Sequence, residues 1–181
     1  VFLVAINFSF LPVPVVWILS IAGAFIFGAA WAFIPAYLQA KRGSHIVITT
    51  IMFNFIASSL MVYLLVDVIR DMKQMGPHTV ALPKELWLPS FKDLAGLFGV
   101  KIRYSPLNAS FLLAIAASFF VWFLVWKTKW GYEMRAVGHN TQAAIYAGIS
   151  PYKNIIIAML ISGGLAGLLS INEILGVHHK I

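Results

Sequence analysis

The amino-acid sequence predicts an all-α, polytopic integral membrane protein with about four transmembrane helices and one short helix outside the bilayer. Hydrophobic residues make up 61% of the chain and charged residues only 10%, whereas a soluble domain usually carries about 25% charged residues. Apolar runs long enough to cross a bilayer, which takes about 20 residues, recur along the chain. We therefore expect one transmembrane domain over residues 1–181.

The predicted spans follow from these apolar runs and from the residues that interrupt them. Residues 1–40 contain no charged side chain, but Pro12 and Pro14 break this run, and proline is tolerated at a helix start rather than inside it. The segment 1–11 is either the end of another span or a re-entrant segment. The expected spans cover residues 15–38, 46–66, 108–126 and 154–175.

The distribution of basic residues predicts how these spans are oriented. The short connections 39–45 and 127–153 carry one acid, Glu133, against Lys41, Arg42, Lys127, Lys129, Arg135 and Lys153. The long connection 69–107 carries six basic and three acidic residues. Because Lys and Arg concentrate in short cytoplasmic loops, we expect the short connections inside and 69–107 as an outer loop.

Composition also excludes several functions. The net charge of +7 is scattered around the predicted helix ends, which suits anionic lipid headgroups and the positive-inside bias rather than nucleic acid. The sequence contains no cysteine, no G-x-x-x-x-G-K-[ST] phosphate loop and no H-E-x-x-H zinc motif. The spans hold almost no ionisable residues, which argues against a membrane-embedded enzyme. We therefore expect no catalytic residue, no metal and no cofactor on this chain.

Small residues recur inside the first and fourth spans. Ala24, Gly28 and Ala32 are spaced by four residues, and Gly163 and Gly167 form a G-x-x-x-G pattern. In lipid, such spacing lets helix backbones approach closely, so that packing holds the helices together. The pattern predicts helix–helix contacts and carries no further functional signal.

A polar, glycine-containing insert, GYEMRAVGHNTQAAIYAGIS, separates the third and fourth spans at residues 131–150. We expect Gly131 to release the chain from the third span and Gly138 to allow a second bend. Asn140 or Thr141 is a suitable N-cap for a short helix. This insert is expected on the cytoplasmic side, near the membrane surface.

The short helix is expected over residues 142–147, with Gly148 as its C′ residue and Pro151 preventing continuation. A membrane-surface helix usually carries larger apolar anchors and more lysine on its polar face. A small surface instead favours docking into a partner's groove, with a simple loop helix as the alternative. The small side chains that suggest this surface are Ala143, Ala144 and Ala147.

The insert resembles the cytoplasmic coupling segment of bacterial ABC importer permeases, in the branch that serves simple sugars, nucleosides and branched-chain amino acids. In that family the segment inserts into a groove of the ATPase and transmits its closure to the membrane helices. The resemblance implies an ATPase-coupling role for Gly131, Arg135, Gly138, Asn140, Ala143, Ala144, Ala147 and Gly148. The pattern is matched at those positions and also at Ala136, Val137 and Ile149.

Two further stretches resemble the same family. A Thr-x-Met-x-Asn run at Thr50, Met52 and Asn54 is similar to the start of a span in the nucleoside and simple-sugar permeases, although Ile46 stands where that family often has an acid. The helix that contains Ser162, Gly163, Ala166 and Gly167 is similar to the family's Ser-Gly-x-x-Ala-Gly helix. The resemblance covers nearly all of residues 12–181, and it implies a longer permease with further helices.

A polar stripe on the second span is our candidate for the substrate pathway. Thr50, Asn54 and Ser58 are spaced by four residues and so share a helix face. Polar groups within a span often line a pathway, but Asn54 can instead bond a neighbouring helix, and Thr50 and Ser58 their own backbone. Glu173, with Asn172 beside it, either reaches water or contacts solute at the outer mouth.

The resemblance implies a permease subunit of an ATP-driven importer for a nucleoside or simple sugar, since no charge is buried in the candidate pathway. It also implies a second permease subunit, ABC ATPase subunits that hold ATP and Mg, and an extracytoplasmic solute-binding protein or lipoprotein. The expected location is the bacterial cytoplasmic (inner) membrane. The alternatives are a channel or secondary transporter, to which the insert gives no task, and a branched-chain amino acid permease of the same family.

Overall fold

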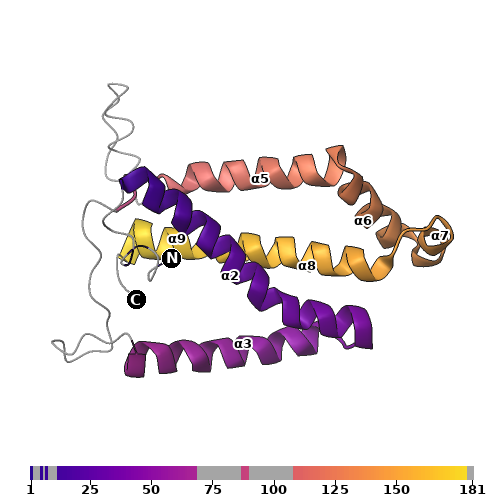
Figure 1. The fold of residues 1–181 in the computed structure, drawn as a ribbon, viewed down its shortest axis with the longest axis horizontal. Coiled ribbons are helices and arrows are strands. Elements are labelled where there is room, and N and C mark those ends of the chain that lie inside the picture. The colour runs from indigo at the N-terminus through magenta and orange to yellow at the C-terminus, as the bar shows by residue number, and fades with distance from the viewer. Residues whose placement is uncertain (2–4, 6, 8–11, 69–86, 90–107, 179–181) are drawn as a thin grey trace.

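A computed structural model describes residues 1, 5, 7, 12–68, 87–89 and 108–178, and the regular elements of this part of the chain are all helical (Figure 1). The all-α fold predicted from the composition is therefore confirmed. The elements are α2 (Val13–Arg42), α3 (Ile46–Tyr63) with its π-helical continuation η1 (Leu64–Val68), α5 (Ser110–Lys127), α6 (Lys129–His139), α7 (Thr141–Tyr146), α8 (Pro151–Gly167), α9 (Leu169–Ile171) and the π-helical segment η3 (Asn172–His178).

Helices at Val13–Arg42, Ile46–Val68, Ser110–Lys127 and Pro151–Gly176 are long and apolar enough to cross a membrane, and they overlap the predicted spans. The first begins at Val13, two residues before the predicted start, with Pro12 as its N-cap residue and Pro14 in its first turn, and it ends at Arg42 with Gly43 as its C-cap. Gly43 has φ 62°, a conformation that glycine adopts without a steric penalty, and its N–H donates to the carbonyl of Gln39 at 3.0 Å.

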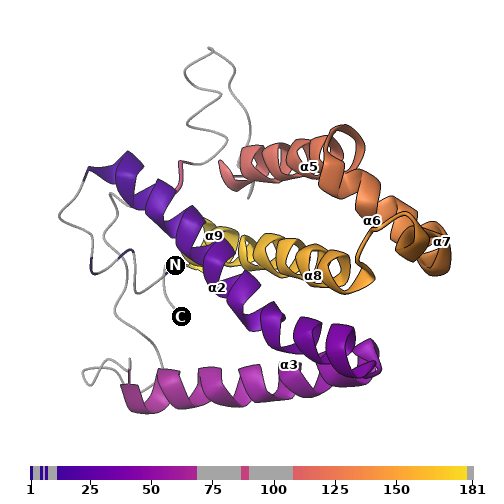
Figure 2. The same cartoon turned by 45° about the vertical axis from the view of Figure 1, so that its right-hand side comes forward.

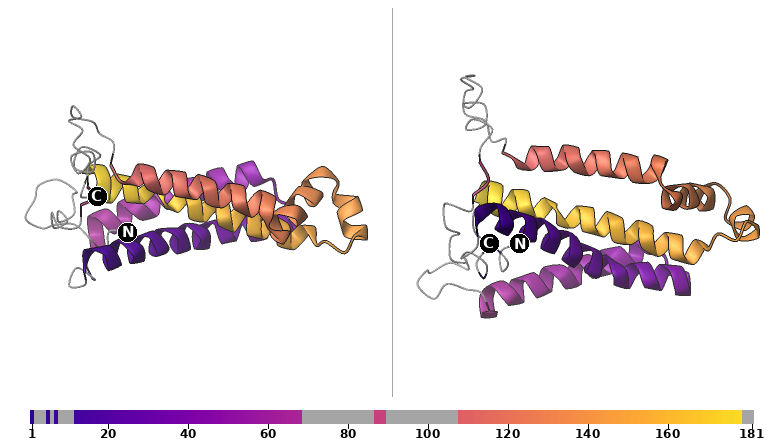
Figure 3. Two further views of the ribbon diagram at one scale, coloured as in Figure 1. Left: turned by 90° about the horizontal axis from the view of Figure 1, so that it is seen from above. Right: turned by 45° about the horizontal axis from the view of Figure 1, so that its top comes forward.

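The long helices run back and forth, so that the two short connections lie at one end of the molecule (Figures 1 and 3). The α2–α3 turn and the α6–α7 pair share that end, while α3 finishes and α5 begins at the other. This arrangement agrees with the expected alternation of short and long connections. The predicted outer loop 69–107, apart from residues 87–89, and most of segment 1–11 lie outside the described residues.

The closest helix contact is the crossing of α2 and α8, where the recurring small residues of both helices meet. A Cβ on Gly163 would collide with the Cβ of Ala32 and lie 2.8 Å from the carbonyl oxygen of Gly28. A Cβ on Gly167 would collide with the carbonyl oxygen of Ala24. The prediction of close packing from these residues is therefore confirmed, and α2 and α8 form the centre of the described fold.

Helix α3 packs much less closely against the rest of the described chain. None of its residues is buried, although the Phe53 ring meets Trp31 of α2 edge-on with ring centroids 6.0 Å apart. A helix that is apolar all round and unburied suits a membrane environment rather than water. Helix α3 lies on the opposite side of α2 and α8 from α5 (Figure 2).

Candidate functional site

The α6–α7 hairpin, residues 129–148, corresponds to most of the insert that the sequence singled out. It begins at Thr128, an extended residue with φ −112° and ψ 158° that separates α5 from α6. The Thr128 hydroxyl donates to the Leu124 carbonyl at 2.6 Å and accepts from the Gly131 N–H at 3.2 Å. Thr128 therefore ends α5 and caps α6.

The expectation that Gly131 releases the chain from the third span is wrong, because Gly131 lies inside α6. A Cβ at this position would collide with the backbone oxygens of Leu124 and Val125. Gly131 thus allows α6 to fold back tightly against the last turn of α5. Gly138 likewise lies within α6 with open space around it. The second bend comes instead at Asn140, which has φ −154° and ψ 105°.

Side chains of α6 fix the hairpin to both neighbouring spans. The Arg135 guanidinium lies 4.5 Å from the centre of the Trp126 ring of α5, a cation–π geometry. On the other side, the buried Asn154 of α8 donates from Nδ2 to the Ser150 carbonyl at 3.0 Å and to Glu133 Oε2 at 3.5 Å. Lys129 Nζ lies 3.9 Å from the other Glu133 oxygen.

Helix α7 is short, and both of its ends are capped. The Asn140 side chain accepts from the Ala143 N–H at 3.0 Å, which confirms the predicted N-cap. At the other end Gly148 has φ 77°; its N–H donates to Ile145 O and the Ile149 N–H donates to Ala144 O, each at 2.9 Å. This pair of bonds is a Schellman motif with glycine at C′, as the sequence indicated.

The exposed surface of α7 is not the surface of small alanine side chains that the sequence suggests. Ala143 and Ala147 are exposed, but Ala144 is 3% exposed and is turned into the protein. The large exposed side chains are Tyr146, at 91%, and Ile145, at 51%. Sequence reasoning missed this pair, because the face that α7 exposes depends on how the hairpin packs against its neighbours. The coupling role of the insert residues stays a prediction.

The predicted pathway stripe of Thr50, Asn54 and Ser58 makes no hydrogen bond with polar side chains of another described helix. Thr50 Oγ1 bonds its own helix, 2.9 Å from the Ile46 carbonyl. Asn54 and Ser58 are exposed, and Asn54 has no hydrogen-bond partner among the described residues. No hydrogen bond from Asn54 to another helix is therefore present in the part of the chain that the structure describes, and the pathway role of the stripe stays a prediction.

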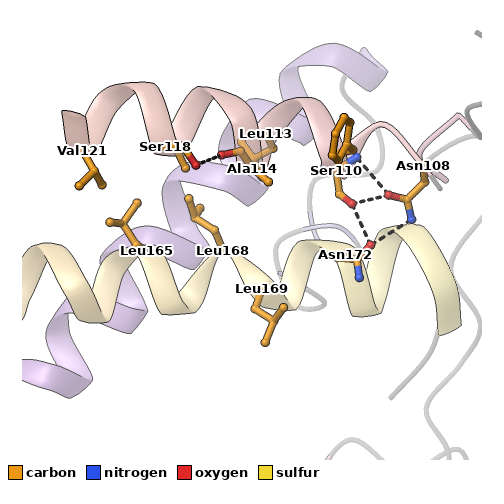
Figure 4. Close-up of a pocket in the computed structure, with 12 residues that line it drawn as sticks. Asn108, Ser110, Leu113, Ala114, Ser118, Val121, Leu165, Leu168, Leu169 and Asn172 are labelled. Atoms are coloured by element: carbon orange, nitrogen blue, oxygen red, sulfur yellow. Dashed lines mark hydrogen bonds between the residues drawn. The ribbon is translucent and has the colours of Figure 1, made fainter. Parts of the chain in front are cut away.

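A groove of about 930 Å³ lies instead between α5 and the α8–η3 helix (Figure 4). Its lining is mostly apolar, with a cluster of polar side chains at one end. Asn108 Nδ2 donates to Asn172 Oδ1 at 3.1 Å, and Ser110 contacts both asparagines. The lining residues are Asn108, Ser110, Phe111, Leu113, Ala114, Ala117, Ser118, Val121, Leu165, Leu168, Leu169 and Asn172.

Backbone bonds also hold this polar end together. The Leu88 N–H donates to the Leu175 carbonyl at 3.0 Å, and the Ala109 N–H donates to the Pro89 carbonyl at 3.1 Å. The start of α5 is thereby tied to the end of the fourth span. No group of histidines, aspartates and glutamates capable of holding a metal occurs among the described residues.

Residues 1–180 match the family described as branched-chain amino acid transport system / permease component, and the chain belongs to this family. With its apolar helices, it is a multi-pass membrane protein of the ABC permease class.

Among its relatives, the chain is 38% identical over 151 residues to the guanosine ABC transporter permease protein NupP of Bacillus subtilis, a match that covers 82% of this chain and 40% of NupP. It is 34% identical to the glucose ABC transporter permease protein TsgB13 of Haloferax volcanii, over 96% of this chain and 45% of TsgB13. It is 33% identical to the nucleoside ABC transporter permease protein NupB of Lactococcus lactis, over 91% of this chain and 44% of NupB.

These names confirm the predicted resemblance to the nucleoside and simple-sugar branch. The chain spans less than half the length of these curated relatives. No solved structure matches the chain.

Proposed function

We propose that this chain is part of the permease subunit of an ATP-driven ABC importer that moves a small, uncharged polar solute across the bacterial cytoplasmic membrane. The solute is a nucleoside or a simple sugar, and the α6–α7 hairpin couples the membrane helices to a separate ATPase. That ATPase binds ATP and Mg, while a second permease subunit and an extracytoplasmic solute-binding protein complete the assembly. The family and the relatives named for guanosine, nucleosides and glucose support this proposal.

The observation that carries the proposal is the shape of the hairpin. A helix as short as the six residues of α7 is marginal in water. Here it is capped at Asn140 and Gly148, and α6 is fixed to both flanking spans. A preformed element that lies beyond the ends of the spans binds a partner without a large ordering cost. A simple loop would not need these constraints.

The charge distribution supports a position of the hairpin on the ATPase side. The two short connections share one end of the molecule (Figure 3) and carry the excess of basic residues. Basic residues in short loops mark the cytoplasmic side, which is where ATP is available. This supports a hairpin that faces the compartment in which we expect its partner.

The exposed pair Tyr146 and Ile145 is the contact that we assign to the ATPase. Aromatic anchors on rigid elements carry much of the binding energy of protein interfaces, and truncating such an anchor costs about 2 kcal/mol or more. We expect Tyr146→Ala to weaken ATPase binding by roughly thirtyfold, since each 1.4 kcal/mol is a factor of ten. The change lies outside the spans, so insertion into the membrane is expected to persist.

The matched control is Tyr132→Ala, because Tyr132 is also an exposed tyrosine, at 62%, but lies on α6. The complete permease is co-expressed with its ATPase, and co-purification and solute-stimulated ATP hydrolysis are measured for both variants. Loss confined to Tyr146→Ala supports the proposal. If Tyr146→Ala retains normal binding and normal stimulated hydrolysis, α7 is not the coupling contact.

A further inference from the structure

The groove between α5 and the fourth span has the size and lining of a small-molecule site. Its volume of about 930 Å³ falls within the range of about 300–1,000 Å³ that such sites usually occupy. Small-molecule sites are mostly apolar with a few well-placed polar groups. The polar groups of this groove are Asn108, Ser110 and Asn172 at one end and Ser118 along the α5 wall (Figure 4).

None of the described residues that line the groove is charged, and this bears on the class of ligand. A charged solute placed among apolar side chains without a counter-charge pays a large desolvation cost. Amide and hydroxyl groups instead complement uncharged hydrogen-bonding groups. Phe111, which is 48% exposed, lines the groove next to the polar end, and an aromatic ring offers a face on which a flat ring can stack. These features favour a neutral, ring-containing solute.

The polar cluster has hydrogen-bond donors that its internal bonds do not use. Asn172 Oδ1 accepts from Asn108 Nδ2 at 3.1 Å and from Ser110 Oγ at 2.8 Å, while Asn108 Oδ1 accepts from the Ser110 N–H at 3.1 Å. These bonds occupy the amide oxygens, and they leave the Nδ2 of Asn172 without a partner among the described residues. The cluster can therefore donate to carbonyl, ring-nitrogen or hydroxyl oxygen acceptors of a solute.

Gly176 makes the cluster possible. A Cβ at this position would collide with Asn108 Nδ2 and lie 3.3 Å from Asn172 Oδ1. The absence of a side chain at Gly176 thus keeps the Asn108 amide in place against Asn172. Within the described part of the chain, the start of α5, η3 and residues 87–89 all contribute to the geometry of this polar end.

We propose that this groove is a solute-binding subsite of the permease, with Asn172 as a hydrogen-bond donor and Phe111 as a stacking surface for a neutral nucleoside or sugar ring. The inference rests on the proposed transport function and assigns it a location other than the stripe on α3. At that stripe Asn54 meets no polar side chain of another described helix, whereas Asn172 of η3 meets Asn108, which lies just before α5.

The first test fills the groove. Ala114 lines it, whereas Ala116 on the same helix is equally an exposed alanine but is not part of the lining. The complete permease, with its ATPase and solute-binding protein, is reconstituted in proteoliposomes, and ATP-dependent uptake of labelled guanosine, uridine and glucose is measured. We expect Ala114→Phe to reduce uptake of the transported solute at least tenfold and Ala116→Phe to leave it within twofold of the wild type.

The second test removes the donor. Asn172→Leu is expected to raise the KM for uptake about five- to tenfold with a smaller change in the maximal rate, because the lost bond concerns solute binding. Asn172→Gln, which keeps the amide, is expected to recover part of the affinity. Equilibrium binding of the same labelled solute to the purified permease is expected to weaken in parallel.

Several results would overturn the inference. Normal uptake by Ala114→Phe would show that the groove is not a solute site, while leaving ATP-driven import intact. If Ala114→Phe fails to assemble with the other subunits while Ala116→Phe assembles normally, a protein helix fills the groove. If Ala114→Phe loses a bound phospholipid but binds solute as the wild type does, the groove is a lipid site. If the wild-type complex imports none of the three solutes in the presence of ATP, the proposed function itself fails.

Discussion

At the scale of single residues, the three glycines of the insert lie in three different environments. Gly148 adopts φ 77° at the end of α7, Gly131 permits a close approach to the backbone of α5, and Gly138 has no neighbour within 4 Å of an added Cβ. The sequence predicts the role of Gly148 correctly but not those of Gly131 and Gly138. Only the first needs the left-handed conformation that favours glycine over other residues.

This difference gives opposite expectations for alanine at two of these positions. Gly148→Ala forces an L-residue into the left-handed region, which costs roughly 1–2 kcal/mol, so α7 is expected to open more often. Gly138→Ala instead improves helix propensity by about 1 kcal/mol within α6. Amide hydrogen exchange over residues 140–149 in the complete permease is expected to speed up in the first variant only. Faster exchange in both, or in neither, would contradict the assigned tasks.

Ala144 shows what the sequence reveals at this scale and what it does not. The residue types predict the N-cap at Asn140 and the glycine at C′, because both follow from local backbone chemistry. The face that α7 turns outward depends on how the hairpin folds onto its neighbours. Ala144 is 3% exposed in consequence, and Tyr146 rather than the alanines dominates the outer surface.

At the scale of elements, α6 is the part that the sequence described least well. The insert was expected to bend at Gly131 and Gly138, yet the structure has one continuous helix between Thr128 and Asn140. Contacts across the chain fix it, with Arg135 against Trp126 and Glu133 against Asn154. Contacts between side chains of different helices leave no periodic signal in the sequence, so the sequence does not predict them.

The Asn154 contact provides a test at this scale. Asn154 is 3% exposed, and its amide joins α8 to α6 through Glu133. Asn154→Leu removes the donor and is expected to destabilise this joint by about 1–3 kcal/mol, the usual cost of leaving a partly buried group unsatisfied. Faster hydrogen exchange within α6 is the expected readout. The neighbouring Tyr152→Leu, at an exposed position, serves as the control.

An unchanged exchange rate in α6 for Asn154→Leu would show that Glu133 and Asn154 do not hold the hairpin. Faster exchange in Tyr152→Leu of the same size would attribute the effect to α8 in general. The prediction holds only if the buried position responds and the exposed one does not.

At the scale of the whole molecule, apolar length predicts the spans well because each helix must satisfy its own backbone in lipid. Small residues also predict that α2 and α8 have close-packing faces. Periodicity alone does not say which helices become neighbours. Helical spacing therefore predicts that Thr50, Asn54 and Ser58 share one face. It does not predict the groove, because Asn108 and Asn172 are 64 residues apart and come together only in the folded chain.

The predicted orientation is open to a direct check, since the sequence contains no cysteine. Single cysteines are introduced at Ser90, in the expected outer loop, and at Thr141, in the hairpin. An impermeant thiol reagent added to intact cells is expected to label position 90, and position 141 only after the cells are opened. Labelling of position 141 but not of position 90 in intact cells would reverse the topology.

The central claim is that this protein couples solute movement to ATP hydrolysis on a partner, and ATP-dependent uptake measures it most directly. The complete permease is reconstituted in proteoliposomes with its ATPase and solute-binding protein, and the entry of labelled guanosine, uridine and glucose is followed with and without ATP. We expect accumulation of at least one solute that requires ATP and stops when the ATPase is omitted. Equally fast entry without ATP or without the ATPase would contradict the claim and would identify a channel or secondary transporter instead.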